Sequence, residues 1–113
     1  MEMDVWNKTG GRCWYCGKQC ITENNLLDSF TVDHVVPISS GVDNSINNRV
    51  PCCRSCNSAK GKRSLEEFRF YRSMKLNHSV MFTIKQVKYL ATIGFTMPIP
   101  DYKFYFETGK EPT

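Results

Sequence analysis

The sequence predicts a small α+β domain, and three observations support this class. Two Cys-x-x-Cys pairs stand at 13–16 and 53–56. An apolar run rich in β-branched residues covers 30–36 and stops at Pro37, which is typical of a strand. Helix-capping patterns recur in the second half of the chain, after the second cysteine pair. The chain is therefore expected to combine strands and helices in one small domain.

The length and the cysteine content indicate one domain, 1–113, that needs support beyond its core. A core built by 113 residues gives only modest stability. No secretion signal opens the chain and no apolar run approaches the roughly 20 residues that span a bilayer, so we expect a cytoplasmic protein without a membrane partner. In that reducing compartment, paired cysteines bind metal more often than they form disulfides.

The first half of the chain divides into short elements. Residues 4–11 predict one or two helical turns, capped by Asp4 and ended by two glycines, followed by a tight knuckle at the first cysteine pair. The strand over 30–36 comes next. Residues 39–48 are turn formers throughout and predict a loop, after which 49–52 predicts a second short strand.

The second half predicts three helices and a strand. The segment NSAK begins a short helix that Gly61 ends, and Ser64 and Thr83 each open a capping box that starts a further helix. In the tail, DYKFYFE places Tyr102, Phe104 and Phe106 on one side in alternation, as a strand would. We interpret these aromatics as packing residues rather than a platform for nucleobases.

The doubled cysteine pairs predict a structural zinc site. Two knuckles on one ion fill all four tetrahedral positions, so no position remains for a catalytic water. Zinc would also supply folding free energy, because the thiolates converge only in the folded chain. The predicted ligands are Cys13, Cys16, Cys53 and Cys56. Cys52 is the alternative to Cys53 but does not keep the two-residue gap to Cys56, and Cys20 is interpreted as a partly buried thiol without a role.

Asp33, His34 and Asn57 are candidates for catalysis. Neighbours in a strand point to opposite faces, so at a strand end Asp33 can hold a divalent cation while His34 approaches a phosphate from another direction. Asn57 follows the second cysteine pair, where it serves either as a cation ligand or as a helix N-cap. A carboxylate and an amide oxygen suit Mg²⁺ or Mn²⁺.

Basic residues gather between positions 49 and 75, within a formal net charge of +4. The cluster suits a polyanion such as the phosphate backbone, and its alternative is a solvated helix face. The basic residues are Arg49, Arg54, Lys60, Lys62, Arg63, Arg69, Arg72 and Lys75, against Glu66 and Glu67.

The string DHVVPISSGVDNSINNRVPCCRSCNSAKG resembles the HNH endonuclease motif in its zinc-bearing form. Its Asp-His and Cys-x-x-Cys-Asn pieces are similar to those of phage endonuclease VII-type resolvases. The resemblance covers about 12–62 and leaves 63–113 as a helical and aromatic extension. It implies a ββα-metal core, with two antiparallel strands, a loop, a helix and one catalytic cation.

The resemblance also implies residue roles. His34 would be the general base, which suits a side chain that titrates near neutral pH, and Asp33 and Asn57 would hold the cation. Asn48 would orient the loop and His34, with Asn47 and Asn44 as alternatives. Lys60 and Arg49 or Arg54 would contact phosphates. The basic cluster adds further candidate DNA contacts, which are Lys62, Arg63, Arg69 and Arg72.

These inferences predict a metal-dependent DNA endonuclease that nicks one strand or cuts both. The alternatives are a zinc module that only binds nucleic acid, which has no need of the Asp-His pair, and a zinc protein that docks other proteins, which leaves the basic cluster unexplained. Expected partners are DNA, a second copy of the chain, or a phage packaging or restriction protein.

Overall fold

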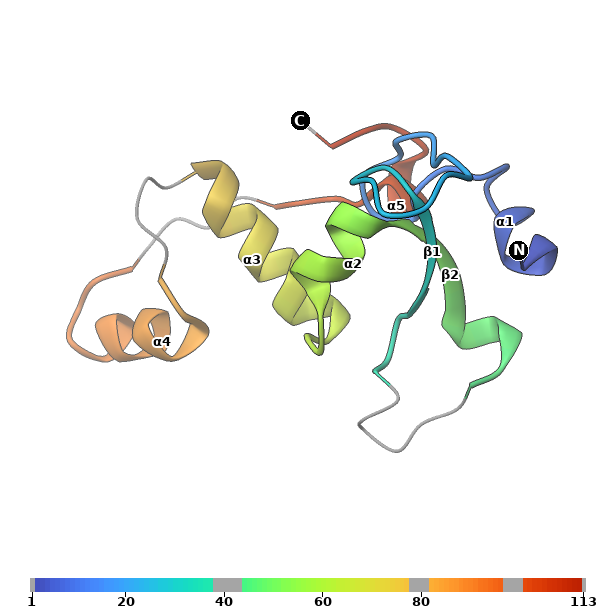
Figure 1. The fold of residues 1–113 in the computed structure, drawn as a ribbon. Helices are drawn as coiled ribbons and strands as arrows, with labels where there is room; N and C mark the ends of the chain where they lie inside the picture. Colours follow the sequence, from blue (N-terminus) through green and yellow to red (C-terminus); the bar gives the residue numbers. More distant parts are fainter. Residues whose placement is uncertain (1, 38–43, 78–81, 97–100, 113) are drawn as a thin grey trace.

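The computed structural model describes residues 2–37, 44–77, 82–96 and 101–112. Its centre is an antiparallel pair of strands, β1 (Phe30–His34) and β2 (Arg49–Cys53). Helix α2 (Arg54–Lys60) follows β2 directly and packs on the two strands (Figure 1). The predicted α+β class with a small ββα core is confirmed.

The strand β1 ends two residues earlier than predicted. In the register, Asp33 lies opposite Val50 and His34 lies opposite Arg49. Beyond this point the facing chain is a 3-10 turn, η2 (Ile46–Asn48), and the N–H of Val35 bonds the carbonyl of Asn48 at 3.0 Å. Asp33 and His34 therefore occupy the end of the strand. Within the predicted loop over 39–48, residues 39–43 lie outside the described part of the chain.

Helix α2 begins three residues earlier than the predicted start at Asn57. Cys53 is its N-cap, and the Cys53 sulfur accepts a hydrogen bond from the backbone N–H of Cys56 at 3.4 Å. The interpretation of Asn57 as an N-cap is therefore wrong, since Asn57 lies inside the helix. Gly61 ends α2 as predicted, with a φ of 51° that favours glycine.

The two predicted capping boxes are confirmed. Ser64 and Glu67 exchange hydrogen bonds of 3.1 and 2.9 Å before α3 (Leu65–Asn77), and Thr83 and Gln86 do the same before α4 (Ile84–Thr92). Figure 1 shows α4 beyond α3, on the side away from the strands. None of the helices in the described ranges is both long and apolar enough to cross a membrane.

Two predictions at the chain ends are wrong. Asp4 is not a cap, because α1 (Met3–Trp6) is preceded by Glu2 and Asp4 lies in its first turn, where a negative charge favours the helix dipole. The tail does not form a strand. It turns into α5 (Tyr105–Thr108), since the Glu107 carboxylate accepts the Phe104 N–H at 2.9 Å and closes a helical turn.

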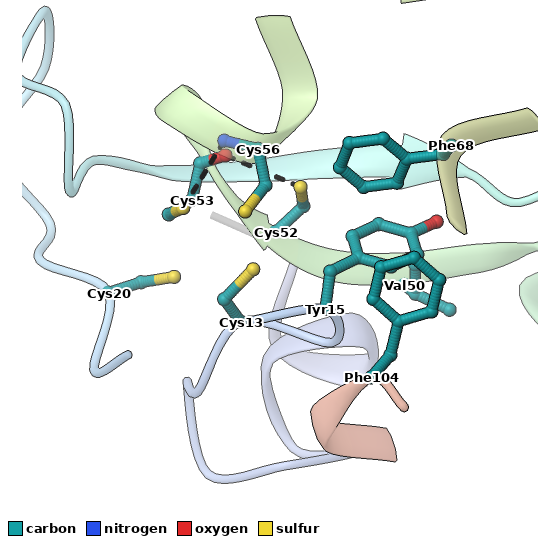
Figure 2. Packing of buried hydrophobic residues seen from close by; sticks show 9 residues of the cluster. All are labelled: Cys13, Tyr15, Cys20, Val50, Cys52, Cys53, Cys56, Phe68 and Phe104. Atoms are coloured by element: carbon teal, nitrogen blue, oxygen red, sulfur yellow. Dashed lines mark hydrogen bonds between the residues drawn. The ribbon is translucent and has the colours of Figure 1, made fainter. Parts of the chain in front are cut away.

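The core joins the tail, α3 and the first cysteine knuckle. Tyr15, Phe68 and Phe104 are each almost fully buried, with ring centroids 5.2–5.3 Å apart (Figure 2). Trp14 stacks on Phe106 at 5.1 Å. The tail aromatics are therefore packing residues, as interpreted from the sequence.

Candidate active site and metal centre

The first cysteine knuckle is fixed from two sides. The Trp14 N–H bonds the Pro51 carbonyl of β2 at 2.8 Å, and the Tyr105 N–H bonds the Tyr15 carbonyl at 2.9 Å. Gly17 follows the knuckle with a φ of 76°, and a Cβ there would lie 2.6 Å from the Tyr105 ring. Only glycine fits this turn, so the knuckle is wedged between β2 and the tail.

The fold brings the four predicted zinc ligands together. The sulfur atoms of Cys13, Cys16, Cys53 and Cys56 all lie within 4.8 Å of one another. A tetrahedral zinc ion with Zn–S bonds of about 2.3 Å places its sulfurs roughly 3.8 Å apart, and the Cys16 and Cys53 sulfurs are 3.8 Å apart. The donor set and its spacing fit a structural zinc ion.

The two other cysteines lie near this group without belonging to it. The Cys52 thiol points to the carbonyl of Cys53, 3.3 Å away, so the fold favours Cys53 over Cys52 as a ligand. Burial raises the pKa of Cys20 to about 12, which keeps this thiol protonated at neutral pH. Both observations agree with the predicted ligand set.

Arg72 lies beside the cysteines rather than on an open surface. Its guanidinium nitrogen is 3.5 Å from the Cys56 sulfur, and its guanidinium carbon lies 5.1 Å from the centre of the Phe68 ring. A positive charge here offsets the negative charge of four thiolates on one divalent ion. The structure thus gives Arg72 a different environment from the predicted DNA contact.

Asp33 is enclosed and bonded through one oxygen. Its Oδ2 accepts a 2.5 Å hydrogen bond from the Tyr15 hydroxyl and lies 3.2 Å from Nζ of Lys60. Lys60 is fully buried and also donates to the His34 carbonyl at 2.9 Å. Lys60 is therefore occupied by partners inside the protein, and its DNA contact stays a prediction from the sequence.

The Tyr15 hydroxyl is a stable hydrogen-bond donor. Burial, and then the neighbouring Asp33 carboxylate, raise the pKa of Tyr15 well above its ordinary value. The phenol therefore keeps its proton at any physiological pH.

Two asparagines contact His34 or the backbone just past it. The Nε2 atom of the His34 ring lies 2.6 Å from Oδ1 of Asn44. The Asn48 side chain bonds both the N–H and the carbonyl of Val36 at 2.9 Å, just past His34. Of the three predicted asparagines, Asn48 thus contacts the backbone after His34 and Asn44 contacts the ring, whereas Asn47 is exposed.

Asn57 faces β1 from α2. Its Nδ2 donates to the Thr31 hydroxyl at 3.0 Å, and Thr31 donates to the Cys52 carbonyl at 2.7 Å. Thr31 and Asp33 alternate with Val32 and so share the strand face that α2 covers. Because the amide nitrogen is used, the amide oxygen is the atom of Asn57 left for a ligand.

The remaining basic residues among the candidate DNA contacts differ in whether their charge is paired or exposed to solvent. Arg49 pairs with Glu2, and Arg69 bonds Glu66, Glu107 and the Tyr102 carbonyl. Arg54, Lys62 and Arg63 are exposed. These three are the candidates that present charge to solvent.

Sequence reasoning missed Tyr15 and Thr31. The period of two in β1 places Thr31 on the face of Asp33, and this signal was available in the sequence. Tyr15 carried no such signal, because only the folded knuckle brings it to Asp33, 18 residues along the chain.

The comparisons with known proteins agree with this geometry. Residues 13–64 match a family model described as HNH endonuclease. The chain is also 31% identical over 103 residues to the CRISPR-associated endonuclease Cas9 1 of Streptococcus thermophilus, a match that covers 80% of this chain and 9% of that protein. The chain thus spans less than a tenth of the length of this relative. With its ββα core and paired cysteine knuckles, this chain belongs to the HNH endonuclease family.

Proposed function

We propose that this chain is a metal-dependent DNA endonuclease that hydrolyses phosphodiester bonds with His34 as general base. The observation that carries the proposal is the way His34 is held. Asn44 contacts its ring and the Asn48 side chain bonds the backbone of Val36, two residues further on, close to the strand end that also carries Asp33. A non-catalytic module has no need of this arrangement.

The hydrogen bond to Asn44 selects the basic nitrogen of His34. An amide oxygen only accepts hydrogen bonds, so Nε2 carries the hydrogen and Nδ1 has the free lone pair. Nδ1 takes a proton from water as the resulting hydroxide attacks the phosphorus atom. The bond from phosphorus to the 3′ oxygen then breaks, and that oxygen takes a proton from solvent water, leaving 5′-phosphate and 3′-hydroxyl ends.

The oxygen donors of Asp33 and Asn57 fit a divalent cation, Mg²⁺ or Mn²⁺. Asp33 and Asn57 lie on the facing elements β1 and α2, and Thr31 orients the Asn57 amide so that its oxygen is available. When bound there, the cation would polarise the phosphate and stabilise the charge on the departing oxygen. Hard oxygen donors of this kind favour these two ions over zinc.

The four cysteines give the site a rigid support. A zinc ion on them would join the first knuckle to the start of α2, because Cys53 caps that helix and Cys56 lies in its first turn. Asn57 comes next in the chain. Its position relative to β1 would therefore depend on the zinc site.

The exposed charges of Arg54, Lys62 and Arg63 support a nucleic-acid substrate. The similarity to a protein named as a CRISPR-associated endonuclease supports the same substrate class. A second copy of the chain and a packaging or restriction partner stay predictions from the sequence.

A plasmid assay tests the proposal. Zinc-loaded protein is incubated with supercoiled DNA and Mn²⁺, Mg²⁺ or EDTA. His34→Ala should bind DNA normally and cut about 10²–10⁴-fold more slowly. His78→Ala, which removes the other histidine of the chain, is the matched control. A DNA shift without cleavage in any metal would instead support a zinc module that only binds nucleic acid.

A further inference from the structure

The carboxylate of Asp33 is held asymmetrically. Both of its partners, the Tyr15 hydroxyl and the Lys60 ammonium group, contact Oδ2. Among the residues that the structure describes, Oδ1 has no hydrogen-bond partner. It is also not one of the polar atoms that are both unpaired and fully buried, so part of it is exposed. Oδ1 is therefore the oxygen of Asp33 that is open to a ligand.

Tyr15 is held in place by ring contacts and by its neighbours in the chain. Its ring makes edge contacts with Phe68 and Phe104 at 5.3 and 5.2 Å, and only 1% of the residue is exposed. One neighbour, Trp14, is bonded to Pro51 of β2 and to Phe106 of the tail, and the other, Cys16, is one of the four converging cysteines. Figure 2 shows the ring between Phe68 and Phe104, with Cys13 close by. The hydroxyl thus has one well-defined position, set by the knuckle and the core together.

We propose that Tyr15 is a positioning residue for catalysis, which fixes Oδ2 of Asp33 and so presents Oδ1 to the catalytic divalent cation. This inference rests on the proposed function, because it assigns the cation to Asp33. It links the two metal sites in one chain of contacts, from the Cys13–Cys16 knuckle through the phenol to the carboxylate. A ligand whose other oxygen is bonded loses less rotational freedom when it binds a metal ion.

Lys60 contacts the same oxygen but is the poorer probe of this role. The buried Lys60 ammonium group also bonds the His34 carbonyl. A substitution of Lys60 would therefore change both the backbone contact at His34 and the local charge. The Tyr15 hydroxyl is neutral, and the Tyr15→Phe substitution removes one hydrogen bond while the ring stays.

The test compares Tyr15→Phe with Tyr71→Phe in zinc-loaded protein. Tyr71 stacks on Phe68 in the same aromatic cluster and makes no contact with Asp33, so it controls for loss of a hydroxyl near the core. Zinc content and thermal unfolding report on the fold. Mn²⁺ binding is measured by the loss of the free-ion EPR signal, and cleavage is measured across a range of Mn²⁺ concentrations.

We expect both variants to keep one zinc ion per chain. Tyr15→Phe should need about 10–100-fold more Mn²⁺, in binding and in cleavage alike, as is usual when the hydrogen-bond partner of a metal ligand is removed. Tyr71→Phe should match the wild type. A Tyr15→Phe protein with wild-type Mn²⁺ binding and cleavage would overturn the positioning role and leave the nuclease intact. A wild type that neither binds Mn²⁺ nor cuts DNA would overturn the proposed function and this inference with it.

A second substitution keeps the test informative if Tyr15→Phe fails to retain zinc. Replacing Tyr15 by 4-aminophenylalanine keeps the ring and places an N–H donor where the hydroxyl was. Mn²⁺ dependence within about threefold of wild type would support the donor role. A folded, zinc-loaded protein with weakened Mn²⁺ binding despite this donor would overturn it.

Discussion

Lys60 and Asp33 form an ion pair in the interior, with Nζ and Oδ2 3.2 Å apart and side chains 0% and 6% exposed. The ammonium group also bonds the His34 carbonyl at 2.9 Å. The pair therefore joins the last residue of α2 to the end of β1, where the candidate base lies. Charges this deeply buried depend on each other, because neither has water to replace its partner.

We predict that Lys60→Met destabilises the protein by about 3–5 kcal/mol, since it leaves the Asp33 carboxylate buried without its cation. Urea unfolding of zinc-loaded protein measures the effect. Lys62→Met is the control, and as an exposed residue just past the end of the same helix it should change stability by no more than about 0.5 kcal/mol. Equal stabilities for the two variants would contradict the ion pair. Adding Asp33→Asn to Lys60→Met should recover part of the stability.

Removal of one zinc ligand should unfold the chain, because metal binding is part of its folding free energy. We expect Cys56→Ser to lose bound zinc, as measured by elemental analysis, and its cooperative thermal transition. Cys52→Ser is the matched control, since Cys52 is buried beside the cluster but lies outside the four converging sulfurs. Loss of zinc in Cys52→Ser with full retention in Cys53→Ser would show that the ligand set is wrong.

The exposed basic residues should carry the salt dependence of DNA binding. Removing a side chain that neutralises one phosphate reduces the slope of log K against log salt by about 0.9. We therefore expect the Lys62→Gln and Arg54→Gln double variant to lower that slope by up to about 2. Arg69→Gln should leave it nearly unchanged, because Arg69 is neutralised by Glu66 and Glu107. A larger decrease in the slope for Arg69→Gln than for the double variant would instead support Arg69 as a DNA contact.

The ion pair between Glu107 and Arg69 makes the attachment of the tail sensitive to acid. The hydrogen bond from Arg69 lowers the pKa of Glu107 below its ordinary value. A carboxyl group with a lowered pKa in the folded state stabilises the fold above its unfolded pKa, and this contribution is lost as pH falls through the folded value. Glu107→Gln should thus be less stable than wild type at pH 7, and the difference should shrink below about pH 4.5.

The stability of Glu107→Gln and of wild type is measured by urea unfolding at each pH. The signal is the fluorescence of Trp14, which stacks on Phe106 of the tail. Glu66→Gln is the control, because the Glu66 side chain is 73% exposed and pairs with the same arginine. A stability difference between Glu107→Gln and wild type that stays constant from pH 7 to pH 3 would contradict the assigned ion pair.

Sequence patterns correctly predicted the elements that are stabilised by contacts between residues close together in the chain. Ser64 and Thr83 open helices because their capping partners lie three residues on. The two-residue gap in each cysteine pair predicted a knuckle, and the fold brings the four sulfurs together. The tail was mispredicted for a related reason. Alternating aromatics in the tail suit a strand, but long-range packing of Phe104 and Phe106 against the knuckle decides its conformation.

The sequence by itself determined the α+β class, the zinc-type cysteine set, the capped helices and the residues of the HNH motif, since all of these follow from spacing and residue chemistry. Only the tertiary structure decided what each charged or polar group contacts. It placed Lys60 on Asp33, Arg72 beside a cysteine sulfur, and the Tyr15 hydroxyl on the candidate metal-binding carboxylate. Each of these contacts joins residues at least 16 positions apart in the chain, and no local pattern encodes such pairings.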